Sequence, residues 1–178
     1  MKINRREFLK NMTFGSCAIV VGSTITGCHT IPTAEQMMVT SELIGRASGK
    51  VIILTKITDE QKAILVQVLN KISIAVPTVN QSFEDCWMKA AQDYLPELKL
   101  DDSVCALILA SVKVASKGID YIFEKRHPEA KQYTDLVEAA IHGFIDGIMT
   151  VIVPPNNVTA VSSVYDIEAY NYLKKFVK

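Results

Sequence analysis

The sequence has little of several features that mark common functional classes. Its four Cys include no Cys-x-x-Cys pair, so thioredoxin-like and haem-attachment chemistry have no motif. It has no Gly-x-Ser-x-Gly turn, phosphate-binding Gly loop or paired-His metal motif. Basic and acidic side chains balance at 19 each without a basic run, so nucleic acid is not an expected partner. These absences favour a protein that is not an enzyme and has no cofactor.

Long apolar runs are also missing. The stretch 12–26 is the most continuous, but it is shorter than the ~20 apolar residues that a membrane-spanning helix needs. Gly15 and Gly22 interrupt it, and Arg5, Arg6 and Lys10 precede it. A basic head followed by a short apolar middle is typical of a secretory signal. We therefore exclude residues 1–27 from the predicted fold.

The basic head reads Asn4-Arg5-Arg6-Glu7-Phe8-Leu9-Lys10. It resembles the bacterial twin-arginine export motif, in which a polar residue, Arg-Arg and any residue precede Phe-Leu-Lys. Only Asn4 departs from the usual pattern, because Ser or Thr is commoner there. The resemblance implies that Arg5, Arg6, Phe8, Leu9 and Lys10 direct export by the twin-arginine (Tat) translocase, which carries folded proteins.

The apolar stretch ends in Ile25-Thr26-Gly27-Cys28, which resembles a bacterial lipobox. The resemblance implies a signal peptide cleaved before Cys28, a diacylglycerol on its thiol and a further acyl chain on the new N-terminus. More than one chain holds a protein firmly on a membrane. Cys17 is a poorer candidate for the lipidated residue, because the aliphatic residue of the lipobox is missing before it. Because His29 rather than Asp follows Cys28, the resemblance favours the periplasmic face of the outer membrane over the inner one.

The mature chain is long enough for one domain with a core. After residues 1–27 are removed, 151 residues remain, with 15 basic and 18 acidic side chains. Residues 28–33 are the lipidated Cys and a short tether. The five residues after Cys28 reach at most ~18 Å, which keeps the domain close to the lipid surface.

Helical periodicity dominates the mature chain. It predicts an all-α fold, a compact bundle of five to six helices. Residues 34–153 are the helical bundle, and residues 154–178 are a loop and a C-terminal amphipathic helix. The predicted helices span residues 33–56, 58–77, 82–95, 102–125, 128–154 and 164–177. In the last of these, Val164, Ile167, Leu173 and Phe176 form the expected apolar face. A strand at 51–54 is the alternative ending for the first helix.

A weak internal repeat accompanies this pattern. Shifting the sequence by 69 residues aligns identical residues at seven positions, among them Gly49 with Gly118 and Ile72 with Ile141. Two amphipathic helices also resemble each other without common descent. The repeat suggests two pseudo-repeated helical hairpins, and both explanations remain open.

Two pairs of glycines stand one turn apart within predicted helices. Gly45 and Gly49 lie in the first, and Gly143 and Gly147 lie in the fifth. Each costs about 1 kcal/mol relative to Ala inside a helix. Packing against a close neighbouring helix offsets that cost. We therefore expect the first and fifth helices to meet neighbours closely at these glycines, including each other.

Few side chains are candidates for chemistry. Glu138, His142 and Asp146 recur on one face of the fifth helix, where they are weak candidates for a metal site. This face is opposite the apolar stripe, so a solvated surface is the expected alternative. Cys86 and Cys105 lie in apolar helical patterns. An oxidising compartment permits a disulfide between them, and burial as free thiols is the alternative.

Together these patterns predict a lipid-anchored helical protein that works by contact with an envelope protein or with a copy of itself. The second hypothesis is a periplasmic protein that binds a small ligand or a metal, or an enzyme exported folded with its cofactor. Folded export keeps that hypothesis open, because many proteins that use the twin-arginine route carry cofactors.

Overall fold

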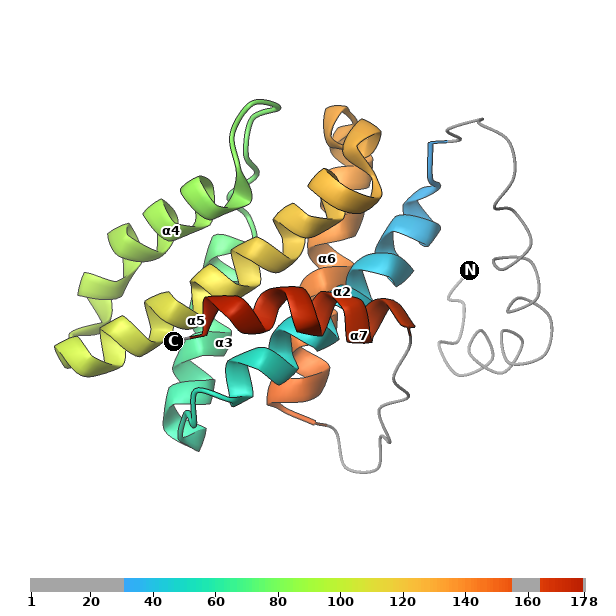
Figure 1. Cartoon of the computed structure of the whole chain (residues 1–178). Helices are drawn as coiled ribbons and strands as arrows, with labels where there is room; N and C mark the ends of the chain where they lie inside the picture. The colour runs from blue at the N-terminus through green and yellow to red at the C-terminus, as the bar shows by residue number, and fades with distance from the viewer. Residues whose placement is uncertain (1–30, 155–163, 178) are drawn as a thin grey trace, which may run out of the picture. The chain divides into compact units, whose positions relative to one another are not determined.

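A computed structural model describes residues 31–154 and 164–177 of the chain, and these residues form helices and no strands (Figure 1). The all-α prediction is confirmed. The α-helices are α2 (Ala34–Ile53), α3 (Asp59–Ile72), α4 (Phe83–Tyr94), α5 (Asp102–Tyr121), α6 (Thr134–Ile152) and α7 (Val164–Leu173). Shorter helical segments are η1 (Leu95–Leu98), η2 (Ile122–Arg126), η3 (Pro128–Gln132) and η4 (Lys174–Phe176).

Side-chain caps set the starts of three helices. Thr33 and Gln36 exchange hydrogen bonds at the start of α2, and Thr58 and Gln61 do the same at α3. The Thr-x-x-Gln spacing is the sequence signature of such a capping box. Ser82 accepts the backbone N–H of Asp85 and so caps α4. These caps satisfy N–H groups that have no partner inside the helix.

Helix α2 includes residues 51–53, so the strand alternative at 51–54 is wrong. Val51 and Ile52 are fully buried, and Leu54 still has helical dihedral angles as the C-cap. The chain turns at Lys56, whose φ of 55° places it in the left-handed region. Helical packing of the apolar side chains therefore overrides the β preference of the Val-Ile-Ile run.

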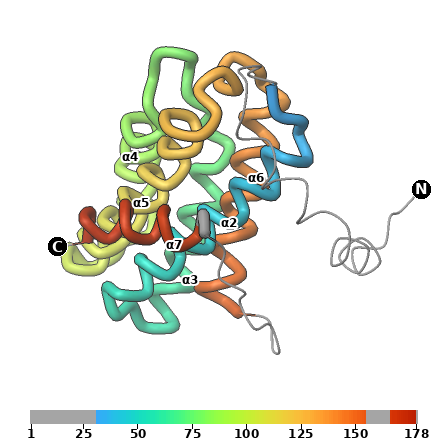
Figure 2. The backbone as a smooth tube through the Cα atoms, turned by 45° about the vertical axis from the view of Figure 1, so that its right-hand side comes forward, coloured from blue at the N-terminus to red at the C-terminus, as the bar shows by residue number. Residues whose placement is uncertain are grey.

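Helices α2 and α6 form the centre of the domain and run in the same direction. Met38 lies against Gly143, Glu42 against Gly147, and Val151 against Gly49. Figures 1 and 2 show both helices starting at one end of the domain. Helix α5 packs beside α2 and forms a hairpin with α4, while α7 lies across α2 and α5.

The core contains a group of aromatic side chains from three helices. Phe83 and Trp87 of α4 pack edge to face at 5.5 Å, and Phe83 stacks on Phe123 at the same centroid distance. Trp87 also contacts Phe144 of α6. Trp87, Phe83 and Phe144 are among the largest fully buried side chains. These rings join α4 to α6 across the end of α5.

The fifth predicted helix starts later than Pro128. Residues Pro128–Gln132 form the 3-10 helix η3, Tyr133 is extended, and α6 begins at Thr134. His127 before the proline has φ −141° and ψ 60°, outside the helical region, because Pro disfavours helical geometry in the residue preceding it. His127 is thus a junction residue between η2 and η3.

The C-terminal helix is oriented differently from the prediction. Ala169 and Leu173 of α7 are fully buried, whereas Ile167 is 54% exposed. Ile167 is therefore not part of the inner face. The ion pair of Asp166 with Lys50 sets this rotation, because it holds Asp166 against α2.

The predicted pseudo-repeat of two hairpins stays a prediction. The 69-residue shift places α3 over residues 128–141, where the structure has η3, an extended residue and the start of α6.

No helix in the described part of the chain is both long and apolar enough to cross a membrane.

Candidate functional site

The exposed face of α6 carries the carboxylates and imidazole that the sequence offered as metal ligands. Glu138, His142 and Asp146 are exposed, while nearly every residue between them is buried. They follow one another every four residues along a solvated stripe. Within residues 31–154 and 164–177, no three His, Cys, Asp or Glu side chains are grouped as a metal ion would need.

Cys86 and Cys105 are free thiols, so the optional disulfide is not formed. The hairpin of α4 and α5 is antiparallel, which separates the first turns of the two helices. Cys86 lies near the Ala75 carbonyl, and Cys105 lies beside Gln92 and Leu95 at the other end of α4. Roughly 18 Å of helix rise separates these ends, whereas a disulfide needs Cα atoms within about 7 Å. Burial raises the pKa of the Cys86 thiol, consistent with an unreactive side chain.

The four glycines lie where α2 and α6 touch. A Cβ added to Gly45 would come closer than 3.0 Å to the carbonyl oxygen of Phe144, a separation that real Cβ atoms essentially never show. Gly143 meets the carbonyl of Met38 in the same way, and Gly147 meets that of Glu42. The expected close approach at these glycines is therefore present, and it is made between the two helices themselves.

Gly118 of α5 is a fifth glycine with no room for a side chain. An added Cβ would overlap the Ser48 hydroxyl of α2 and the Phe144 ring of α6. Ser48 is fully buried and donates its hydroxyl proton to the carbonyl of Ile44. Because Gly118 has no side chain, α5 packs directly against the interface between α2 and α6.

Asp120 of α5 is a buried carboxylate with a defined structural role. Its two oxygens accept the backbone N–H groups of Phe83 at 2.7 Å and Glu84 at 3.0 Å, the first residues of α4. A carboxylate at a helix N-terminus is favourable because it faces unpaired N–H groups and the positive end of the helix dipole. Burial nevertheless raises the pKa of Asp120, and the two N–H groups oppose that rise.

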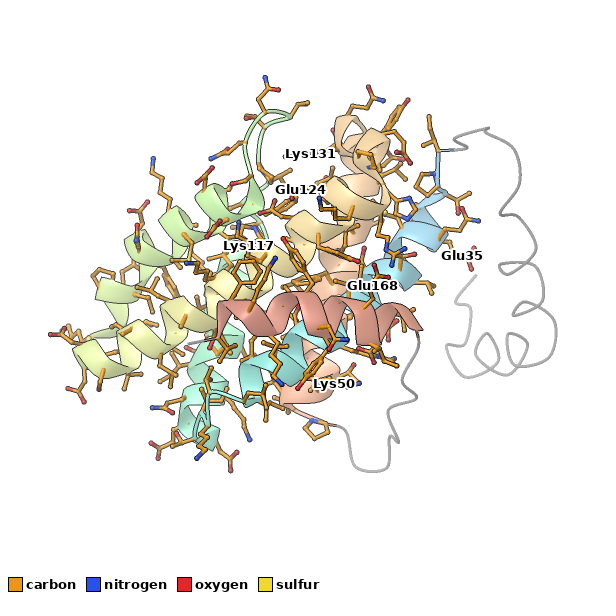
Figure 3. All side chains as sticks on the ribbon, in the orientation of Figure 1. Glu35, Lys50, Lys117, Glu124, Lys131 and Glu168 are labelled. Atoms are coloured by element: carbon orange, nitrogen blue, oxygen red, sulfur yellow. The ribbon has the colours of Figure 1, made fainter. Side chains whose placement is uncertain are left out.

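The side chains around Asp120 carry both signs of charge. Lys117 pairs with Glu84, and this hydrogen bond raises the pKa of Lys117. Glu124 adds a negative charge that contributes to the raised pKa of Asp120. Figure 3 labels Lys117 on α5 and Glu124 on η2, the segment that continues it. The group holds the ends of α4 and α5 together, and no sequence motif marks it.

Hydrogen bonds and ion pairs hold the first half of α7 against the domain, and aromatic packing holds its second half. Lys50 of α2 donates to the buried Asp166 at 2.7 Å. Glu168 accepts the hydroxyl of Tyr121 at 2.9 Å and pairs with Arg126 (Figure 3). Farther along, Tyr172 packs on Tyr121 with ring centroids 5.0 Å apart. These contacts make α7 part of the core.

One open hollow lies between α5 and the end of the described chain. It measures about 480 Å³ and is lined by Thr55, Ala110, Lys113, Val114, Lys175, Phe176 and Val177. The ammonium of Lys175 lies 5.0 Å from the ring centroid of Phe176. Two lysines beside an aromatic ring suit a small anion with an apolar part.

Exposed apolar side chains gather in the connection between α3 and α4. Ile74 is 76% exposed, Val79 61% and Val76 44%. This cluster was not predicted from the sequence. The available signal was the composition of 73–82, where aliphatic residues stand among Ser, Pro, Asn and Gln although helix connections are usually polar.

The export motif Arg5, Arg6, Phe8, Leu9 and Lys10 and the lipobox Ile25, Thr26, Gly27 and Cys28 lie outside the described residues. They stay predictions from the sequence. In comparisons with known proteins, no family model, no curated protein and no solved structure matches this chain.

Proposed function

We propose that the chain is an exported bacterial lipoprotein that works by contact rather than catalysis. Acyl chains on Cys28 hold it at the periplasmic face of a membrane, the outer one by resemblance. The observation that carries this proposal is the order and spacing of two motifs, residues 4–10 and 25–28, ahead of a helical domain. During export it meets the twin-arginine translocase and the lipoprotein-processing enzymes. Its lasting partner is an envelope protein or a second copy.

The fold supports a tethered body. The capping box at Thr33 starts α2 five residues after Cys28, so the packed domain begins almost at the proposed anchor. Glycine contacts between α2 and α6 leave the two backbones nearly touching, which favours a rigid body that presents its surface unchanged. A rigid surface held near a membrane suits recognition of a neighbouring envelope component.

The second candidate is binding of a small anionic ligand, and the hollow at Lys113 and Phe176 favours it. At about 480 Å³ its size is within the range of small-molecule sites. Lys113 and Lys175 supply positive charge and Phe176 supplies an apolar wall. Such a ligand would make the protein a periplasmic binding component.

Processing variants test the anchor. Cys28→Ser should abolish lipid labelling and leave a larger precursor, because the signal peptidase for lipoproteins acts on the modified Cys. Cys17→Ser is the matched control and should be lipidated normally. The measurement is incorporation of labelled palmitate together with the intact mass. A lipidated Cys28→Ser protein would contradict the anchor.

Export is tested by replacing both arginines. Arg5→Lys combined with Arg6→Lys should leave the protein in the cytoplasm, and cell fractionation measures this. Normal export of that variant would contradict the twin-arginine route.

Native mass spectrometry of the exported protein separates the two candidate functions. A stoichiometric small molecule supports the second, and an unliganded protein that co-purifies with one envelope protein supports the first.

A further inference from the structure

The apolar side chains between α3 and α4 are presented by a backbone that is fixed from behind. The Ala75 carbonyl accepts the indole N–H of Trp87 at 3.0 Å, and the Gln81 carbonyl accepts the Lys131 ammonium. Ala75 and Pro77 are partly buried, whereas Ile74, Val76 and Val79 are exposed. The connection thus has an inner side held by hydrogen bonds and an outer side made of aliphatic residues.

This connection lies at the end of the domain where the described chain begins. Lys131 of η3 joins it to the start of α6, and α2 runs parallel to α6. Figures 1 and 2 both show the connection, η3 and the start of α2 at this one end. Ile31 and Tyr133 add exposed apolar surface there. We call Ile31, Ile74, Val76, Val79 and Tyr133 the apolar end.

The covalent chain brings the proposed anchor to the same end. Ile31 follows Cys28 by three positions, a stretch that spans at most ~11 Å when fully extended. Acyl chains on Cys28 therefore hold a lipid surface within that distance of Ile31. Exposed aliphatic side chains gathered at one end of a domain indicate an interaction surface, and the nearest available apolar phase is this lipid.

We propose that the apolar end rests on the lipid bilayer, with Ile74, Val76 and Val79 in the interfacial layer. This inference rests on the proposed lipidation of Cys28. The end carries Lys131 together with Glu35 and Glu124 (Figure 3). Because both signs of charge are present, the contact is apolar and does not require anionic lipids. The opposite end of the domain, with Val153, points away from the membrane.

Depth measurements on the full-length, lipidated protein in phosphatidylcholine vesicles test the orientation. In a background with Cys86→Ser and Cys105→Ser, a polarity-sensitive fluorophore is attached at Val79→Cys or Val153→Cys. Val153 is the matched control because it is also a valine, 57% exposed, outside the apolar end. The Val79 label should shift to the blue and be quenched by lipid-borne quenchers. The Val153 label should remain accessible to iodide in water.

Equal behaviour of the two labels would overturn the inference. So would a Val79 label that is shielded from iodide but unaffected by lipid-borne quenchers, because a second copy or another protein then covers the apolar end. The intact mass of each labelled protein is measured in parallel. Absence of lipid on Cys28 would refute the proposed anchor, whereas a lipidated protein with an aqueous Val79 label would refute the orientation alone. Circular dichroism checks that both labelled proteins are folded.

Discussion

Hydrogen atoms in place of side chains let α2 and α6 meet. At Gly147 a Cβ would collide with backbone atoms of Glu42 and Arg46, and backbone atoms cannot move aside without bending the helix. At Gly49 the nearest atom is instead the Val151 side chain at 2.9 Å, with the Ile148 carbonyl oxygen at 3.2 Å. The two glycines therefore differ in how rigid their surroundings are.

Gly147→Ala should destabilise the protein. The added methyl meets fixed backbone, and overpacking of this kind costs roughly 1–3 kcal/mol, which exceeds the ~1 kcal/mol that Ala gains inside a helix. Thermal unfolding followed by circular dichroism should show a lower melting temperature. Gly49→Ala is the control and should lose less, because Val151 can adjust. An unchanged or raised melting temperature for Gly147→Ala would contradict the close contact.

Asp120 should make stability depend on pH in an unusual direction. Burial raises its pKa above the ordinary value of 3.8, so the folded protein keeps this proton at pH values where the unfolded chain has released it. The stability contributed by this group is then greatest below that value and falls as the pH rises through the raised pKa. Most carboxylates that gain a cationic partner behave oppositely, as Asp59 does, because Lys62 lowers its pKa.

Asp120→Asn should remove this contribution. The melting temperature of the variant, relative to that of the unchanged protein, should rise as the pH increases above 3.8, because the Asp120 carboxyl becomes charged and the amide that replaces it does not. Asp93→Asn, at an exposed position of α4, is the matched control. If both variants follow the same profile, burial of Asp120 does not set the pH dependence.

The elements differ in how fully the sequence reveals them. The Thr-x-x-Gln spacings stand at the starts of α2 and α3, and Pro96 follows the end of α4 by two residues, because such signals act over a few residues. The predicted end of α3 at Pro77 is wrong, because the helix ends at Ile72. The rotation of α7 was not predictable in this way. It depends on the ion pair between Lys50 and Asp166, residues 116 apart in the chain. Because α7 is short and has aliphatic residues on several sides, its sequence alone does not show which of them are buried.

Two substitutions on α7 measure that rotation. Leu173→Ala should cost about 2–5 kcal/mol, because it opens a cavity at a fully buried position. Ile167→Ala should stay within about 0.5 kcal/mol, because Ile167 is largely solvated. Urea unfolding of both variants provides the comparison. Equal losses would mean that α7 buries Ile167 as well.

For the whole molecule, the helical class and the glycine contact followed from the sequence, whereas the arrangement at the two ends of the bundle did not. Gly45, Gly49, Gly143 and Gly147 were informative because a glycine inside a helix is costly without a close neighbour. The apolar end was not foreseen, since its members come from 31, 74–79 and 133 and gather only through folding. The buried Asp120 and the charged side chains around it were not predicted for the same reason.

The pairing of α2 with α6 also affects when the protein can fold. Gly45 and Phe144 touch but are 99 residues apart in the chain. A ribosome adds about 5–20 residues per second, so α2 is made about 5–20 s before the helix that covers it. The central contact of the domain therefore forms only after α6 has been made. A route that moves finished proteins suits this order of assembly better than one that threads the chain as it is made.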